Sequence, residues 1–383
     1  MPRGDDFMSK KNRDAASVEP QKSPRPRKIF YFLIGLISLA VLEVGGQIFY
    51  HTKFSQQEDL LLRAFMGLGG TYNPDMVSNY TPHHYLVYTL NPNTKWYYES
   101  YYGKEPKQLI NSLGYRGKEI TKEKPAHTFR IVCLGGSTTF GLGEADEAYT
   151  YPALLEKRLN ELYPSGPHFE VVNAGTPGWS SGESLINLHF RVLDLNPDMV
   201  VLYDGINDTF AMRKPEEGKS DYSTFRNIVH YEMPAEWEKT FLRASAFCRL
   251  LYYANNKSNV AFDINSLAVK GSPSGFSEID QLNHATGIYF KRNVQSFVAI
   301  AKAHHVTPVL VTMGHGPWHP SLALTCKIMR EVAGSQNATL VDFEPYSRAG
   351  WFDMDNVHLL RPGNTALAEV IARTLGAKGL IPR

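Results

Sequence analysis

The chain has 383 residues, 43% of them hydrophobic and 20% charged, which leaves room for one large folded domain with additions or for two domains. Its formal net charge is +2, but residues 1–28 alone carry eight Lys or Arg and four Asp or Glu, a net of +4, so the remainder sums to −2. The body is therefore not basic enough to suggest a nucleic-acid surface. Three cysteines without CxxC spacing form neither a complete disulfide framework nor a metal site.

The N-terminal region combines a basic flank with an apolar run. Residues 1–28 are polar and end in a basic cluster at 22–28, so we predict a disordered basic cytoplasmic tail. Residues 29–42 are uncharged and strongly apolar, and after Glu43 the apolar character resumes to about Tyr50. The whole span approaches the ~20 residues that a helix needs to cross a bilayer.

Three interpretations compete for residues 29–50. A cleaved signal peptide needs a small-x-small site after its apolar core, and residues 43–47 offer no convincing one. A buried core helix is not usually preceded by such a basic flank. We therefore predict a single-pass signal anchor, although Glu43 is costly unless it lies near the interface. The basic residues before the span outnumber Lys53 and Arg63 after it, which predicts an exported body on the inner (cytoplasmic) membrane.

Residues 51–128 form a membrane-proximal extension that is harder to interpret. Residues 56–66 predict a short amphipathic helix, and residues 85–102 are aromatic and β-prone. Exposed aromatic rings stack on sugars in some proteins, but aromatic residues in strands more often pack against cross-strand neighbours. We favour packing for these residues.

From residue 129 onward, short apolar runs alternate with helix-type periodicity, which predicts an α/β fold with a parallel sheet and right-handed crossovers. We expect strands at 129–134, 169–172, 197–203, 307–312 and 339–343, and helices at 151–163, 182–195, 287–304, 322–335 and 362–375. The first strand contains Cys133, which predicts a buried apolar thiol.

The alternation is interrupted by a large insertion at about 209–286, with a helix expected at 241–253. An insertion of this length beside strand ends usually forms a lid or a specificity wall. The alternative is an extension that serves only stability or contacts with another protein.

Glycines and polar residues follow the carboxyl ends of the predicted strands, where open α/β sheets form their binding crevice. Ser137 follows the first strand, Gly178 the second and Asn207 the third, and Asp355 and His358 lie after the fifth. Each residue alone has an ordinary explanation as a turn, a cap or a surface residue. Four such blocks at one edge of the sheet instead predict a site for acyl transfer.

Acyl transfer needs a nucleophile, a base and donors for the developing oxyanion. Neutral His358 would remove the proton of Ser137 during attack, and Asp355 would orient the imidazole. The backbone N–H groups of Ser137 and Gly178, with the Asn207 amide, would bind the oxyanion.

These residues resemble the SGNH (GDSL-type) hydrolase superfamily, in particular its membrane-anchored bacterial members. The resemblance covers about 129–210 and 287–376, and its blocks I, II, III and V correspond to residues 129–139, 173–178, 205–208 and 355–358. Gly136 stands where the family has the Asp of its GDSL motif, which is not the acid of the triad. The resemblance implies a flavodoxin-like three-layer sandwich with a five-stranded parallel sheet over residues 129–383. It also implies hydrolysis or transfer of carboxylic esters without a metal or cofactor.

We therefore expect a serine esterase that acts on an ester, in particular an acetyl ester, of a glycan or another cell-envelope substrate. One alternative is an O-acetyltransferase of a polysaccharide pathway that uses the same residues, and another is a non-catalytic glycan-binding or scaffold module. The expected partners are an acylated glycan, a lipid or another ester, the membrane, and envelope polysaccharide machinery, without nucleic acid. Further candidate substrate contacts are Thr138, Asp208, His315 and Trp318.

His315 and His319 form an H-x₃-H pair that would suggest zinc on a helix. Gly316 and Pro317 lie between them and argue against a helix, and no third ligand is evident. We expect a substrate contact or a structural loop here rather than a metal site.

Overall fold

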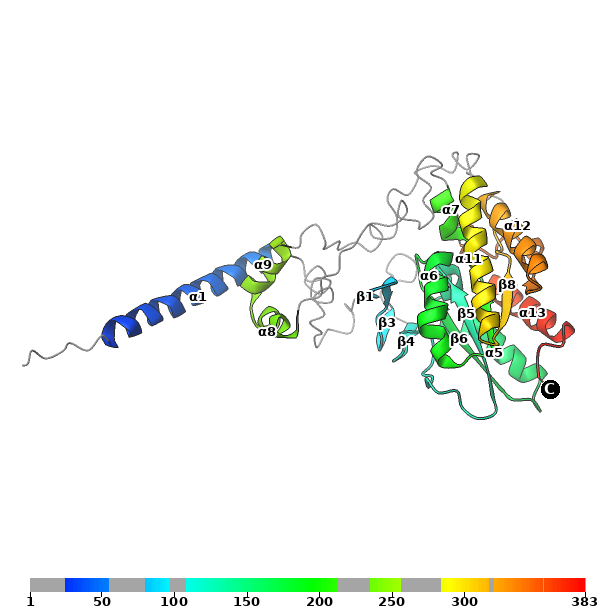
Figure 1. Ribbon diagram of the computed structural model, residues 1–383, viewed down its shortest axis with the longest axis horizontal. Coiled ribbons are helices and arrows are strands. Elements are labelled where there is room, and N and C mark those ends of the chain that lie inside the picture. Colours follow the sequence, from blue (N-terminus) through cyan, green and yellow to red (C-terminus); the bar gives the residue numbers. More distant parts are fainter. Residues whose placement is uncertain are drawn as a thin grey trace, which may run out of the picture.

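The computed structural model describes residues 25–54, 80–96, 108–212, 235–255, 284–316, 320–353 and 355–382. Most of them form an α/β body, and a long N-terminal helix, α1, extends from it at one end of the molecule (Figure 1).

The centre of the body is a sheet of five parallel strands. They are β5 (Thr128–Gly135), β6 (His168–Gly175), β7 (Met199–Leu202), β8 (Thr307–Val311) and β9 (Thr339–Val341). Their order in the sheet, β6-β5-β7-β8-β9, is the flavodoxin-like order 2-1-3-4-5. The predicted α/β fold class is confirmed. Because Gly135 pairs with Gly175, the chain leaves β5 and β6 at the same level of the sheet.

Helices cover both faces of this sheet, which explains why its strands are continuous apolar runs. Ile131 and Cys133 of β5 point to one hydrophobic cluster, and Val132 and Leu134 point to the other. Burial raises the pKa of the Cys133 thiol to about 12, as expected for the predicted apolar thiol. One cluster includes α5 (Tyr151–Leu162) and α13 (Arg361–Ala377), and the other includes α6 (Ser181–Asn187), α11 (His284–Ala303) and the C-terminal half of α12 (Pro320–Ser335).

Two predicted helices are broken. The helix expected at 182–195 consists of α6, a π-helical turn η3 (Leu188–Val192) and a 3₁₀ turn η4 (Leu193–Leu195). The wider π turn keeps Leu188 and Val192 buried against the sheet. The helix expected at 241–253 is two helices, α8 (Glu236–Ala244) and α9 (Ala246–Asn255). Ser245 between them is extended, and its hydroxyl accepts the N–H of Cys248 at 3.0 Å, which caps α9.

Residues before the sheet pack into the same body. Antiparallel hairpins form between β1 (Tyr80–His83) and β2 (Val87–Leu90), and between β3 (Thr94–Trp96) and β4 (Gln108–Ile110). Tyr88 is 2% exposed, so the expected packing of aromatic residues is confirmed at this position. The backbone N–H of Arg116 donates to Asn173 of β6 at 3.2 Å. Residues 80–96 and 108–128, which precede the predicted boundary at 128/129, are thus bonded to the sheet and its loops.

Helix α1 (Arg25–Lys53) begins within the flank that we expected to be disordered. Residues 25–28 are helical because they continue the apolar helix by one turn, and Pro26 is compatible with a first helical turn. Among the described residues, Arg27–Lys53 is the one helix long and apolar enough to cross a membrane. The rest of the predicted tail and the helix expected at 56–66 lie outside the described residues.

Candidate active site

Ser137 opens a short helix, α4 (Ser137–Phe140), directly after β5, and Gly135 and Gly136 form the turn between them. Gly135 has a φ of +155°, and a Cβ there would lie 2.2 Å from the Tyr203 carbonyl oxygen. A Cβ on Gly136 would lie 2.8 Å from the Trp179 carbonyl oxygen and 2.9 Å from Asn207 Nδ2. The position where the family has Asp therefore has no space for a side chain in this protein.

A continuous chain of hydrogen bonds links Ser137 to the loop before α13. The Ser137 hydroxyl lies 2.7 Å from His358 Nε2, and His358 Nδ1 contacts Asp355 Oδ2. Asp355 Oδ1 also accepts the backbone N–H groups of Val357 and His358 at 3.0 Å each, which fixes the turn that carries the imidazole. Ser137 and His358 are 221 positions apart in the sequence, and the structure brings them together.

The environment of Asp355 determines the tautomer of His358. Burial alone would raise the pKa of Asp355, but the hydrogen bond and electrostatic attraction of His358, together with two backbone N–H groups, hold that pKa at about 2. An ionised carboxylate accepts hydrogen bonds, so Nδ1 carries the proton. Nε2 is then an acceptor directed at the Ser137 hydroxyl, which is the arrangement that a general base needs.

Two contacts hold the loop after Ser137 against the loop after His358. Arg361, the first residue of α13, donates to both carboxylate oxygens of Glu144, at 3.1 and 3.0 Å. The buried amide of Asn364 donates to the Leu359 carbonyl at 2.9 Å, and its oxygen accepts the Tyr151 N–H at 3.2 Å. The distance between nucleophile and base is therefore set by the start of α13.

Gly178 and Asn207 lie on the other side of the Ser137 turn. The Asn207 amide donates to the Trp179 carbonyl at 2.7 Å, and its nitrogen carries a second hydrogen. Asn207 Nδ2 is adjacent to Gly136, the residue before Ser137. Gly178 has a φ of +83°, which turns the chain between Pro177 and Trp179. The structure thus brings Asn207 and the Gly178 loop to the Ser137 turn.

The N-terminal extension supports this loop. The Tyr88 hydroxyl donates to the Pro177 carbonyl at 2.9 Å, and the Trp179 indole N–H donates to the Tyr88 carbonyl at 3.2 Å. Trp179 and Leu86 are both fully buried in the same cluster. Residues outside the predicted hydrolase segment therefore fix the position of Gly178.

Arg116 also contacts the Ser137 turn, and the sequence analysis missed it. Its guanidinium donates to the carbonyls of Phe140, Gly141 and Glu144 at 2.6, 2.8 and 2.8 Å, and it stacks on the Phe140 ring at 4.7 Å. Arg116 is 3% exposed and so binds the carboxyl end of α4 from inside the protein. Arg116 lies in a polar segment that contains Gly114 and Gly117, a pattern typical of a surface loop. The sequence carries no signal that its side chain points inward.

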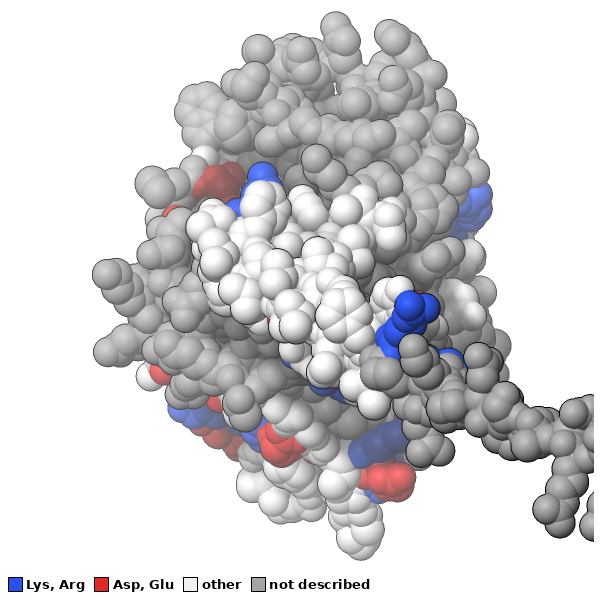
Figure 2. Space-filling view, turned by 90° about the vertical axis from the view of Figure 1, so that its left-hand side faces the viewer, with Lys and Arg blue, Asp and Glu red and all other residues white. Residues whose placement is uncertain are grey.

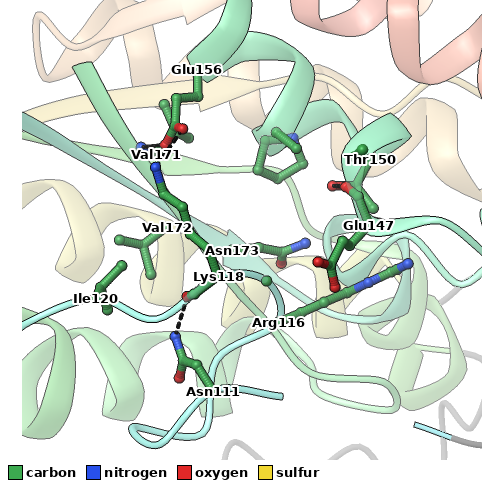
Figure 3. Close-up of a pocket in the computed structure, with 14 residues that line it drawn as sticks. Asn111, Arg116, Lys118, Ile120, Glu147, Thr150, Glu156, Val171, Val172 and Asn173 are labelled. Carbon is green, nitrogen blue, oxygen red and sulfur yellow. Dashed lines mark hydrogen bonds and ion pairs between the residues drawn. The ribbon is translucent and has the colours of Figure 1, made fainter. Parts of the chain in front are cut away.

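A cavity of about 190 Å³ lies between residues 111–120, α5 and β6 (Figure 3). Arg116 and Glu147 lie on one side of it and Glu156 on another, where Glu156 accepts the Val171 N–H at 2.8 Å. Its described lining does not include Ser137, Asp355 or His358. The cavity is thus separate from the hydrogen-bonded chain, and Arg116 lines the cavity while it also binds the carboxyl end of α4.

The predicted substrate contacts differ in their exposure. Thr138 and Asp208 are buried, with 1% and 0% of their surface exposed, so their role as substrate contacts stays a prediction. Both ring nitrogens of His315 face oxygens, Nε2 that of Glu344 at 3.1 Å and Nδ1 the Gly316 carbonyl at 2.8 Å. Trp318 lies outside the described residues. Among the described residues, no three His, Cys, Asp or Glu side chains are grouped so that they could hold a metal ion.

A buried polar network that the sequence did not reveal lies behind Asn207. The Ser181 hydroxyl and N–H donate to Asp208 at 2.5 and 3.0 Å, and the Asn293 amide donates to Ser181 at 3.0 Å. The Ser184 hydroxyl donates to Asp204 at 2.6 Å. Burial, and then the charge of Asp208, raise the pKa of Asp204 well above that of an ordinary aspartate. This network joins the start of α6 to α7 (Ile206–Met212), which carries Asn207.

Comparisons with known proteins identify the family of this chain. The model of the GDSL-like Lipase/Acylhydrolase family matches residues 133–366. A search of curated proteins gave no significant match.

Three similar solved structures each share 18% identity with this chain. They include the lipase/acylhydrolase from Enterococcus faecalis (67% of this chain and 98% of that chain covered, TM-score 0.41). For TesA, 65% of this chain and 98% of that chain are covered, with a TM-score of 0.40. For a catalytic mutant of an acetylxylan esterase from Geobacillus stearothermophilus, 65% of this chain and 94% of that chain are covered, with a TM-score of 0.39.

Proposed function

Because this chain belongs to the GDSL-like lipase/acylhydrolase family, we propose that it is a membrane-anchored serine esterase that removes short acyl groups, in particular acetyl, from a cell-envelope glycan. The observation that carries this proposal is the chain of hydrogen bonds from Ser137 through His358 to Asp355.

In the proposed mechanism, Ser137 Oγ attacks the ester carbonyl carbon while its proton passes to His358 Nε2. The tetrahedral oxyanion accepts hydrogen bonds from the N–H groups of Ser137 and Gly178 and from the Asn207 amide, and each such donor contributes roughly 10²–10³ in rate. Collapse expels the alcohol, which takes the proton from His358. Water then attacks the acyl-enzyme with the same base, and release of the carboxylic acid restores Ser137. Asp355 stays ionised throughout and stabilises the imidazolium.

Two observations support the choice of substrate. Ser137 is 7% exposed, which favours a small acyl group over a long chain. The basic residues at 22–28, before the apolar run 29–50, outnumber Lys53 and Arg63 after it, which favours a cytoplasmic N-terminus and an exported body. An enzyme in that position would meet esters of the cell envelope.

The test uses the full chain in detergent with p-nitrophenyl acetate and p-nitrophenyl octanoate as substrates. We expect the acetate to be hydrolysed faster, and Ser137→Ala to lower kcat at least ~10⁴-fold because the nucleophile is lost. A fluorophosphonate probe should label the wild type and not this variant. Ser335→Ala, which changes a serine at the end of α12, is the matched control. Unchanged turnover in Ser137→Ala would end the assignment.

Product analysis distinguishes the related functions. With an acetylated oligosaccharide we expect free acetate. A predominantly acetylated acceptor would indicate acyl transfer by the same residues, and a folded protein that resists the fluorophosphonate would indicate a binding module.

A further inference from the structure

Glu43 interrupts the apolar surface of α1, and its partners come from the insertion in the hydrolase body. Its carboxylate accepts the N–H groups of Ala246 and Phe247 at 2.9 and 3.4 Å and the hydroxyl of Ser245, and Gln47 donates to it at 2.8 Å. These backbone N–H groups open α9, where an anion is stabilised by the helix dipole and the unsatisfied donors. Glu43 therefore caps a helix that lies about two hundred positions later in the chain.

The contact between α1 and α9 continues beyond Glu43. A Cβ on Gly46 would lie 2.9 Å from Phe247 Cβ, whereas a Cβ on Gly45 would meet nothing within 4 Å. Gly46 thus allows the two backbones to approach closely, as small residues do between membrane helices. Tyr50 of α1 and Phe54, which directly follows α1, are buried in a cluster with residues of α8 and α9. Figure 1 shows α9 beside the C-terminal end of α1.

Many of the side chains that point outward around this contact are apolar, although Lys53 of α1 and Arg243 of α8 are also exposed. On α1 they include Val44, Ile48 and Phe49, which are 59%, 63% and 57% exposed. On α8 and α9 they include Trp237, Phe241 and Leu251, at 67%, 58% and 50%. Figure 2 shows that this end of the molecule is mainly uncharged where its residues are described, with basic and acidic side chains near the margin. Exposed apolar surface of this extent marks an interaction site.

We propose that α8 and α9 lie in the outer part of the lipid bilayer, packed against α1. This inference rests on the proposed membrane anchoring of α1. The cap at Glu43 places the start of α9 about seven residues, or ~10 Å, before the end of the apolar run at Tyr50. A bilayer that surrounds the apolar part of α1 therefore also surrounds the start of α9. Lipid is then the partner of Trp237, Phe241 and Leu251, and the aromatic residues suit the membrane interface.

This arrangement explains how an acidic residue is tolerated in a membrane-spanning helix. A carboxylate in the hydrocarbon is costly unless it is paired, and here α9 supplies backbone donors. In the sequence, the insertion that contains α8 and α9 follows α7, which carries Asn207.

The test measures nitroxide labels on the full chain in phospholipid vesicles, in a Cys248→Ser background because Cys133 and Cys326 are buried. Labels replace Phe241 and Leu251, with Val41 as the reference on α1 and the 62% exposed Ile288 of α11 as the matched control on the body. We expect lipid-soluble oxygen to relax the labels at 41, 241 and 251 several-fold more strongly, relative to a water-soluble nickel complex, than the label at 288.

The outcomes separate the inference from the membrane anchor. If positions 241 and 251 behave like 288 while 41 is in lipid, α8 and α9 are outside the bilayer and the inference is wrong. If both are shielded from oxygen and from nickel, another protein covers them, and the inference is equally wrong. If the label at 41 is itself exposed to nickel, α1 does not lie in the bilayer, and both the membrane anchoring and the inference are wrong. The proposed esterase activity is measured separately and does not depend on this outcome.

A second measurement tests the contact itself in membranes. Cysteines in place of Gly46 and Phe247, in the Cys248→Ser background, should be cross-linked by mild oxidation, which joins their two tryptic peptides. Their Cβ positions are 2.9 Å apart, so a shift of about 1 Å between the helices gives the separation of a disulfide. Cysteines in place of Gly45 and Phe247 are the matched control and should give at least several-fold less product. Equal yields from the two pairs would contradict the packing of α9 on α1.

Discussion

At the scale of single residues, the proposed chemistry depends on how one imidazole is held. His358 has a carboxylate on one ring nitrogen and a serine hydroxyl on the other, and the turn that carries it is fixed by two N–H groups that donate to Asp355. Asp355 therefore has two separable effects, one on the tautomer of His358 and one on the stability of the turn.

Replacing Asp355 with Asn should reveal both effects. Because an amide does not select the productive tautomer, we expect kcat for an aryl acetate to fall roughly 10²–10⁴-fold. The pKa of Asp355 is about 2 in the folded protein and ~3.9 in an unfolded chain, so the carboxylate stabilises the fold above pH 4 and this contribution disappears as the pH falls toward 2. The variant should be less stable by about 1–2 kcal/mol at pH 7, with a smaller difference at pH 2–3, measured by denaturant unfolding.

Glu369→Gln is the matched control for this experiment. Hydrogen bonds from Arg158 lower the pKa of Glu369, so it too stabilises the fold above its unfolded pKa, but it lies on α13 away from the imidazole. Its loss should leave kcat unchanged. A normal kcat in Asp355→Asn would contradict the role of the carboxylate.

At the scale of secondary-structure elements, segments that precede β5 hold the loops at its end. The guanidinium of Arg116 donates hydrogen bonds to three carbonyls at the carboxyl end of α4, the helix that begins with Ser137. Lysine is a single point donor and does not reproduce a guanidinium fork.

We therefore expect Arg116→Lys and Arg116→Ala to lower kcat about tenfold or more with little change in KM, since Arg116 acts on the position of Ser137. Added guanidinium should partly restore the alanine variant. The control is Arg130→Ala, because Arg130 is also buried and donates to the Leu195 carbonyl at 2.7 Å, but at the start of β5. It should lose stability and keep its kcat per folded molecule. Equal effects on kcat in the two alanine variants would reduce Arg116 to a structural role.

At the junction of α6 and α7, a buried carboxyl group lowers the stability of the fold at neutral pH. Burial and the nearby Asp208 raise the pKa of Asp204, so folding favours its protonated form, and the unfolded carboxyl ionises near pH 4. The cost to stability is absent below that pH and grows as the pH rises toward the folded pKa.

Asp204→Asn removes the cost of burying a carboxylate. The amide oxygen of the asparagine can still accept the Gly205 N–H, and its NH₂ group can donate to the Ser184 hydroxyl, which then accepts instead of donating. We expect a higher melting temperature at pH 7, by a few degrees if the gain is about 1 kcal/mol, and no gain at pH 4. Asp342→Asn should show the opposite sign, since hydrogen bonds from Arg330 outweigh burial and lower the pKa of Asp342. A destabilised Asp204→Asn at pH 7 would contradict this account.

At the scale of the whole molecule, we expect charge to determine the proposed orientation in the membrane. Arg25, Arg27 and Lys28 open α1, and Lys53 closes it. Protease added to intact spheroplasts should digest the body and leave an N-terminal epitope protected. Replacing the three basic residues with Asn should yield a mixed population, because the bias that retains the N-terminus in the cytoplasm is weakened. Protection of the body in the wild type would reverse the proposed topology.

The sequence alone was sufficient for the sheet and for the residues that meet at its edge. Buried parallel strands are continuous apolar runs, so β5 and β7 are recognisable by composition, and their loops necessarily lie at one edge. Ser137, Gly178, Asn207, Asp355 and His358 were identified in this way, together with the apolar helix α1. These features depend on local periodicity and on topology, which the order of residues specifies.

The positions of Arg116, Tyr88 and Glu43 were decided only by the tertiary structure. Each is a polar or aromatic residue in a segment whose local pattern fits a surface, a strand or a membrane span, and each has partners tens to hundreds of positions away. The break between α8 and α9 has the same origin, because the Ser245 hydroxyl accepts the N–H of Cys248 in α9 and donates to Glu43 of α1. Periodicity reports which face of a segment is buried, whereas the identity of the partner depends on which distant segment the fold brings to that face.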